Sequence, residues 1–210
     1  MTRIHKTVLI LVALIALVLG LTVSKVLNAP SAHDPAALAE AGIILLSQSR
    51  ALPALSLLDE QGQAQAADQL KGRWTLLFFG YTFCPDICPT TLAELRQLRN
   101  QLAPELLERY RVTMVSVDPQ RDSPEQLRQY LGFYNAGFTG LTGELAAIQQ
   151  LSSAVSIPFI PGDSSQQHYT VDHSGNIALI GPDGRQRGFI RAPLNVARLA
   201  AQLPVLLRQE

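Results

Sequence analysis

The chain has 210 residues, of which 47% are hydrophobic and 16% are charged, with 17 acidic and 17 basic side chains. This length allows one ordinary domain with an appendage. Because the charges balance and no cluster of lysine and arginine is present, we predict no nucleic-acid binding.

The N-terminal segment predicts a membrane anchor. Residues 7–24 read TVLILVALIALVLGLTVS and carry no charge, which is about the minimum length for crossing a hydrocarbon core about 30 Å thick. Arg3 and Lys6 precede this run, which favours a cytoplasmic N-terminus and an exported remainder. A cleaved signal peptide is the alternative, because small residues follow at 29–32, although the apolar run is longer than signal peptides use. We predict a single-pass helix over residues 1–26 in a bacterial-type inner membrane, with the globular domain on the periplasmic side.

The remainder of the chain predicts a spacer over residues 27–50, with a short helix after Asp34, and one domain over residues 51–210. A strand at 52–58 followed by Asp-Glu-Gln-Gly predicts a hairpin. The run RWTLLFFGY at 73–81 is typical of a strand buried on both faces.

Helices and strands alternate in the rest of the domain. Helical spacing, strand-like runs and capping residues predict helices at 90–107, 123–135, 143–155 and 195–208 and strands at 112–117, 169–172 and 176–180. The last two strands are expected to form a hairpin. This order indicates an α/β fold, and a thioredoxin-like three-layer sandwich with a central mixed sheet fits it, although periodicity alone does not select that fold.

The two cysteines of the chain, Cys84 and Cys88, lie between the first buried strand and the first long helix. A disulfide between them would close a very small loop and add little stability, which favours a redox or metal-binding role. Pro89 is expected to be the first helical residue and Cys88 the N-cap, so that its sulfur faces the positive end of the helix dipole. Asp86 is expected to close the loop by accepting backbone N–H bonds. Two thiolates at one helix start can form a disulfide or bind a soft metal.

A thiolate pair suits Cu(I) or zinc, and copper needs at least one further ligand. Met114 lies inside a buried strand pattern, so histidine is the better candidate. His173 occupies the predicted hairpin turn beside Asp172, whose carboxylate could accept the second ring N–H, as metal-binding histidines require. His168 is a weaker candidate.

Three blocks of sequence resemble the Sco/SenC (PrrC-like) family of copper-binding cytochrome oxidase assembly proteins. They are FGYTFCPDICPTTL at 79–92, SVDPQRDSP at 116–124 and VDHSGNIALIGPDG at 171–184. The resemblance covers about residues 50–208, and a Cys-Pro-Asp-x-Cys-Pro block with a later Val-Asp-His is far more specific than two cysteines alone. From the residues themselves we assign no chemistry to 118–124, which strand termination and helix capping explain.

The resemblance implies a thioredoxin-like domain on an N-terminal anchor. It also implies one copper ion per domain, as Cu(I), Cu(II) or both, held by Cys84, Cys88 and His173. Copper would pass to the dinuclear copper centre of cytochrome c oxidase, so the expected partners are the copper-accepting oxidase subunit and other copper chaperones.

Two other functions compete with a metal carrier, which itself would not be an enzyme. Cys84 and Cys88 could be the redox pair of a thiol–disulfide oxidoreductase that keeps target cysteines reduced for metal loading. The sequence Cys-Pro-Thr at 88–90 also suggests a peroxiredoxin-type peroxidase, but this chain has Pro85 where such enzymes place a threonine. We expect no peroxide consumption.

Overall fold

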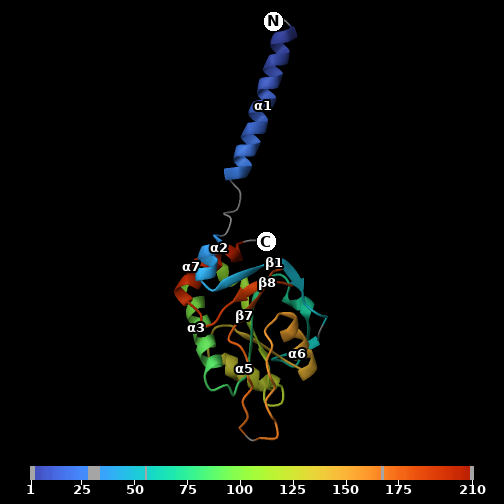
Figure 1. Cartoon of the computed structure of the whole chain (residues 1–210), viewed down its shortest axis with the longest axis vertical. Helices are drawn as coiled ribbons and strands as arrows, with labels where there is room; N and C mark the ends of the chain where they lie inside the picture. The colour runs from blue at the N-terminus through green and yellow to red at the C-terminus, as the bar shows by residue number, and fades with distance from the viewer. Residues whose placement is uncertain (1–2, 28–33, 55, 167, 209–210) are drawn as a thin grey trace. The chain divides into compact units, whose positions relative to one another are not determined.

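The computed structural model describes residues 3–27, 34–54, 56–166 and 168–208. The chain divides after Asp34 into two units (Figure 1). The first unit contains helix α1 (Arg3–Leu27). Among the described residues, no helix combines the length and the apolar character that a membrane crossing requires, so the predicted anchor is not confirmed. Residues 28–33 of the predicted spacer lie outside the described residues.

The second unit, as far as it is described, is built on an eight-stranded mixed sheet with the order β1-β8-β7-β4-β5-β6-β2-β3. The three central strands β4, β5 and β6 are parallel, and their neighbours on both sides are antiparallel. The strands are β1 (Ile43–Ala51), β2 (Ser56–Asp59), β3 (Ala64–Ala66), β4 (Trp74–Gly80), β5 (Tyr110–Ser116), β6 (Thr139–Thr142), β7 (Ile177–Ile180) and β8 (Arg185–Ile190).

Strand β4 is the core of this sheet and confirms the predicted buried strand. All seven of its residues are buried, because the sheet is covered on both faces there. It pairs in parallel with β5, with Leu76 opposite Val112, and both strands therefore end at the same edge. The loop that contains the two cysteines follows β4 at this edge.

Helices cover the two faces of the sheet. They are α2 (Pro35–Glu40), α3 (Ile87–Gln101), α4 (Pro104–Leu107), α5 (Pro124–Gly132), α6 (Leu145–Ala154) and α7 (Val196–Leu207), with a short 3-10 helix, η1 (Ala67–Leu70). Helices α3 and α7 pack side by side (Figure 1). Helix α5 packs on strand β6, because a Cβ at Gly140 would meet Leu131 and Leu127 of that helix.

The start of the second unit matches the predicted spacer only in part. Helix α2 is the short helix predicted after Asp34, whereas strand β1 was not predicted, and the predicted boundary at residue 51 falls inside it. Strand β1 pairs antiparallel with β8, with Ile43 opposite Ile190, and so covers what would otherwise be a free sheet edge. This pairing partner is about 140 residues away in the sequence, which is why the local pattern did not reveal the strand.

The predicted hairpin of residues 169–172 and 176–180 is wrong. Strand β7 pairs with β4 on one side and with β8 on the other, so it has no free edge for a third partner. Asp172 instead forms an isolated bridge with Ile160. The earlier hairpin is confirmed as β2–β3, with Asp59 Oδ1 accepting from Gln61 N at 2.9 Å in its turn.

Candidate metal centre

The two cysteines are placed by the start of α3. The helix begins at Ile87 with Asp86 as its N-cap, so the prediction that Cys88 is the cap is wrong. Pro89 is the third helical residue, which is tolerated because the first N–H groups of a helix have no partner within it. The Asp86 side chain makes no capping hydrogen bond, contrary to its expected role in the loop.

Backbone N–H groups hold both sulfurs. Tyr81 N donates to Cys88 Sγ at 3.4 Å, and Cys88 N donates to Cys84 Sγ at 3.5 Å. Cys88 is fully buried, whereas Cys84 is partly exposed. The Cys88 sulfur can pack against the end of β4 because residue 80 is glycine. A Cβ at that position would lie only 2.7 Å from the sulfur.

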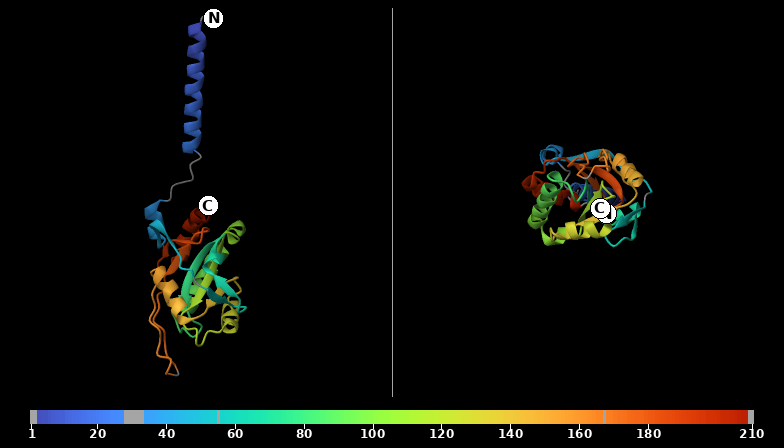
Figure 2. Two further views of the ribbon diagram at one scale, coloured as in Figure 1. Left: turned by 90° about the vertical axis from the view of Figure 1, so that its right-hand side faces the viewer. Right: turned by 90° about the horizontal axis from the view of Figure 1, so that it is seen from below.

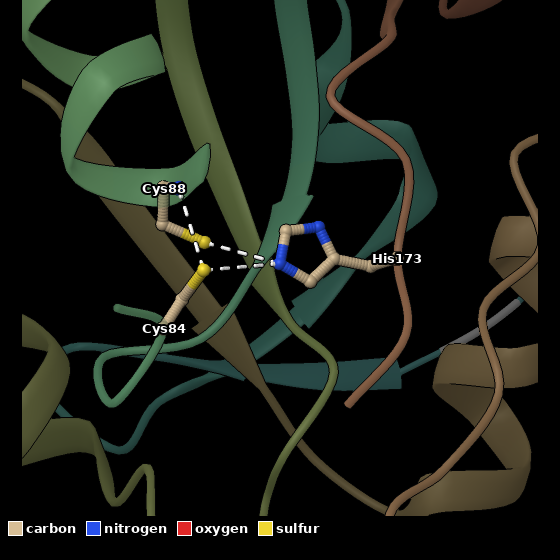
Figure 3. Close-up of side chains that lie close together, drawn as sticks. All are labelled: Cys84, Cys88 and His173. Atoms are coloured by element: carbon tan, nitrogen blue, oxygen red, sulfur yellow. Dashed lines mark hydrogen bonds between the residues drawn. The ribbon is translucent and has the colours of Figure 1, made fainter. Parts of the chain in front are cut away.

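His173 completes a cluster of three potential ligands (Figure 3). Its Nε2 lies 3.4 Å from Cys84 Sγ and 3.4 Å from Cys88 Sγ, and all three donor atoms lie within 4.8 Å of one another. Its Nδ1 lies 3.4 Å from the carbonyl oxygen of Ser174, which takes the place predicted for the Asp172 carboxylate. With a proton on Nδ1, the lone pair of Nε2 would face the two sulfurs. His168 is exposed in the preceding loop and is not part of this cluster.

Aromatic rings fix the orientation of the imidazole. The Tyr81 ring meets the His173 ring edge-on, with centroids 5.5 Å apart, and Phe78 does the same at 6.4 Å. The Tyr81 hydroxyl also accepts a hydrogen bond from Val171 N at 3.3 Å. Tyr81 therefore contacts Cys88 through its N–H and the His173 segment through its side chain. No spacing or periodicity in the sequence points to this role, although Tyr81 lies inside the cysteine block.

The two thiols differ strongly in acidity. The hydrogen bond from the Cys88 thiol lowers the pKa of Cys84 to about 4, against the opposing effect of burial. The same hydrogen bond and burial both raise the pKa of Cys88. At neutral pH the pair therefore carries one negative charge, on the more exposed sulfur. A thiolate is the form that binds a soft metal or attacks a disulfide.

The spacing of the three donors suits a small soft ion. Zinc binds sulfur at about 2.3 Å and nitrogen at about 2.0 Å. At trigonal or tetrahedral angles around such an ion, a sulfur ligand and a nitrogen ligand lie about 3.5–3.7 Å apart. The nitrogen–sulfur distances of 3.4 Å are only a few tenths of an ångström shorter. Two sulfurs with one imidazole are a donor set for Cu(I) or zinc, and they do not suit Mg²⁺ or Ca²⁺.

Comparison with known proteins decides the family. The family model for SCO1/SenC matches residues 46–208, most of the chain. The chain belongs to the SCO1/SenC family. It is 49% identical over 175 residues to a Stutzerimonas stutzeri protein whose name refers to copper binding, and this match covers 83% of the chain and 86% of that protein.

A mitochondrial SCO2 homologue shares the same domain in a longer chain. The Bos taurus protein is 38% identical over 131 residues, which are 61% of this SCO1/SenC chain. The match spans about half of the bovine protein's own length, 49%. The similarity therefore concerns the shared domain.

Solved structures confirm the predicted thioredoxin-like α/β fold. Bradyrhizobium japonicum ScoI with copper bound is 31% identical with a TM-score of 0.65, covering 73% of this chain and 98% of that one. Arabidopsis thaliana ScoI, also with copper bound, is 28% identical with a TM-score of 0.65, covering 74% and 96%. Copper binding is thus a property of structures that this SCO1/SenC chain resembles.

Proposed function

We propose that this SCO1/SenC protein is a copper metallochaperone that binds one copper ion through Cys84, Cys88 and His173. The observation that carries the proposal is the convergence of two sulfurs and one imidazole nitrogen, from segments 85 residues apart, at 3.4 Å. Soft donors at this spacing select a soft ion. The copper-bound ScoI structures of similar sequence support copper as that ion.

The recipient in this proposal is the dinuclear copper centre of cytochrome c oxidase, and other copper chaperones would supply the ion. Delivery by ligand exchange requires a donor atom of the recipient to reach the ion while the first ligands are still bound. Cys84 and His173 are partly exposed, whereas Cys88 is buried. An incoming ligand would therefore displace Cys84 or His173 first, and Cys88 last.

We further propose that α1 attaches the chain to a bacterial-type inner membrane, with the globular domain on the exported side. Residues 7–24 are uncharged, and apolar side chains such as Leu14 and Leu17 are exposed. Apolar surface of this kind requires an apolar environment. Membranes from expressing cells should keep the chain after an alkaline wash, and Leu14→Arg with Leu17→Arg should release it. Release of the unaltered chain by the same wash would overturn this placement.

The copper proposal is tested by titrating the reduced full-length chain with Cu(I) in competition with a chromogenic chelator. We expect one equivalent to bind tightly. Cys84→Ala, Cys88→Ala and His173→Ala should each weaken binding by about 10-fold or more. His168→Ala is the matched control, because this exposed histidine lies outside the cluster. If the three ligand variants all bind Cu(I) like the unaltered chain, the proposal fails.

A second candidate function is thiol–disulfide exchange, which the unequal acidity of the cysteines favours. The Cys84 thiolate would attack a target disulfide, forming a mixed disulfide and releasing one target thiolate. Cys88, on losing its proton, would then attack Cys84 Sγ and release the second target thiol, leaving an oxidised pair that an external thiol reductant must reduce. This chemistry does not need the imidazole, so full activity of His173→Ala in cells would favour it over copper transfer.

A further inference from the structure

The segment from Asp118 to Asp122, between β5 and α5, contacts both loops that contain the three candidate ligands. The Asp122 carboxylate is fully buried and accepts from Thr82 Oγ1 at 2.6 Å and from Thr82 N at 3.1 Å. It also accepts from Ser116 Oγ at 2.6 Å. Thr82 lies two residues before Cys84, so Asp122 fixes the cysteine loop to the end of β5.

The other half of this segment holds the loop that leads to His173. Tyr169 Oη donates to Asp118 Oδ1 at 2.5 Å, and Arg121 Nη2 donates to the carbonyl oxygen of Tyr169 at 3.0 Å. The Arg121 guanidinium lies 3.6 Å from the centroid of the Tyr169 ring and 5.1 Å from that of Phe83 in the cysteine loop. Arg121 and Asp118 also form an ion pair. We call Asp118, Arg121 and Tyr169 the clasp.

The clasp holds the end of a long loop that leads to His173. The described part of residues 157–172 extends away from the sheet as a long loop (Figure 2). Between Tyr169 and His173, Val171 N donates to the Tyr81 hydroxyl at 3.3 Å, and the carbonyl of Asp172 accepts from Ile160 N at 2.8 Å. Without the clasp, the entropy of ordering this loop would oppose a fixed imidazole position.

We propose that Arg121 and Asp118 are positioning residues, which hold Tyr169 and thereby keep His173 in place as the third ligand. This inference rests on the proposed function, because it concerns the same metal centre. A site that is already ordered binds without the cost of ordering the loop, so the clasp should raise copper affinity without contacting the ion. Asp122 does the same for the cysteine side of the site.

A double-mutant cycle on the full-length chain separates positioning from general stability. We expect Arg121→Met to weaken Cu(I) binding by about 10-fold when His173 is present. In a His173→Ala background it should change the affinity by less than about 2-fold, because the clasp acts through the imidazole. Arg121→Lys should restore only part of the loss, since an ammonium cannot stack on Tyr169 or donate in the same planar geometry.

The matched control is Arg187→Met, which removes another arginine from an ion pair, with Asp183 in the turn after β7. It should leave copper affinity unchanged. An equal loss from Arg121→Met in both His173 backgrounds, or no loss at all, would overturn the inference.

A measurement without copper keeps the inference testable if the chain does not bind the ion, in which case the proposed function fails separately. Amide hydrogen exchange at Val171 should become about 10-fold faster or more in Arg121→Met, whereas exchange in β4 should not change. Unchanged exchange at Val171 would show that the clasp does not hold this segment.

Discussion

Replacing Gly80 by alanine tests whether the close approach of α3 to β4 sets the position of the Cys88 sulfur. A Cβ at this position would lie 2.7 Å from Cys88 Sγ and 2.7 Å from Cε1 of Phe78. Ordinary contacts between carbon atoms are about 3.5–4.0 Å, so the overlap is about 1 Å. Phe78 is fully buried in the central strand, so its ring can shift only by displacing neighbouring core side chains. The strain should therefore be divided between a lower stability and a displaced sulfur.

We expect Gly80→Ala to lower the free energy of unfolding by about 1–3 kcal/mol and copper affinity by about 10-fold. Denaturant unfolding of the copper-free chain and Cu(I) competition measure the two effects. Gly132→Ala in α5 is the control, because no atom lies within 4 Å of its added Cβ. This control should be neutral or more stable by up to about 1 kcal/mol. If Gly80→Ala unfolds at the same midpoint as the unaltered chain and binds copper equally well, our account of this contact is incorrect.

Three further outcomes follow from the site and its supports. The pKa of about 4 means that Cys84 should keep its thiolate absorbance and its reactivity toward iodoacetamide down to about pH 4, and Cys88→Ala should move both transitions upward toward an ordinary thiol pKa. Ser123→Ala removes the side-chain cap of α5 and should cost about 1 kcal/mol in denaturant unfolding, whereas Ser123→Asp should not. Asp122→Ala leaves the Thr82 donors unpaired and should cost roughly 3 kcal/mol, with a smaller loss for Asp122→Asn, which keeps one acceptor oxygen.

The unequal cysteines connect the two candidate functions. The sulfur of Cys84 is ionised and partly exposed, and that of Cys88 is protonated and buried. This arrangement suits a pair of cysteines that exchanges disulfides. For a metal ion, Cys84 would be a ligand that is already deprotonated, whereas Cys88 would have to lose its proton before binding. Copper binding should therefore release a proton from Cys88. Thiol–disulfide exchange does not need an imidazole, so the His173 ring at 3.4 Å from both sulfurs favours metal binding.

Elements with a complete local signal were predictable from the sequence. An apolar run marked β4, an Asp-Glu-Gln-Gly turn marked the hairpin of β2 and β3, and Ser123 before a proline marked the start of α5. In each case neighbouring residues supply the hydrogen bonds or the burial pattern. Strand β1 had no such signal, because its partner β8 is remote in the sequence and determines its conformation.

The sequence by itself determined which side chains could form a soft metal site, because only cysteine and histidine in this motif provide such donors. It also determined the central strand and the helix that flank the cysteines. Only the tertiary structure decided that the Ser174 carbonyl faces the imidazole and that Tyr81 and Arg121 support the site. These contacts join residues whose spacing in the chain carries no periodic signal. They require β4, β5 and the loop before β7 to lie together, an arrangement that burial of the sheet stabilises.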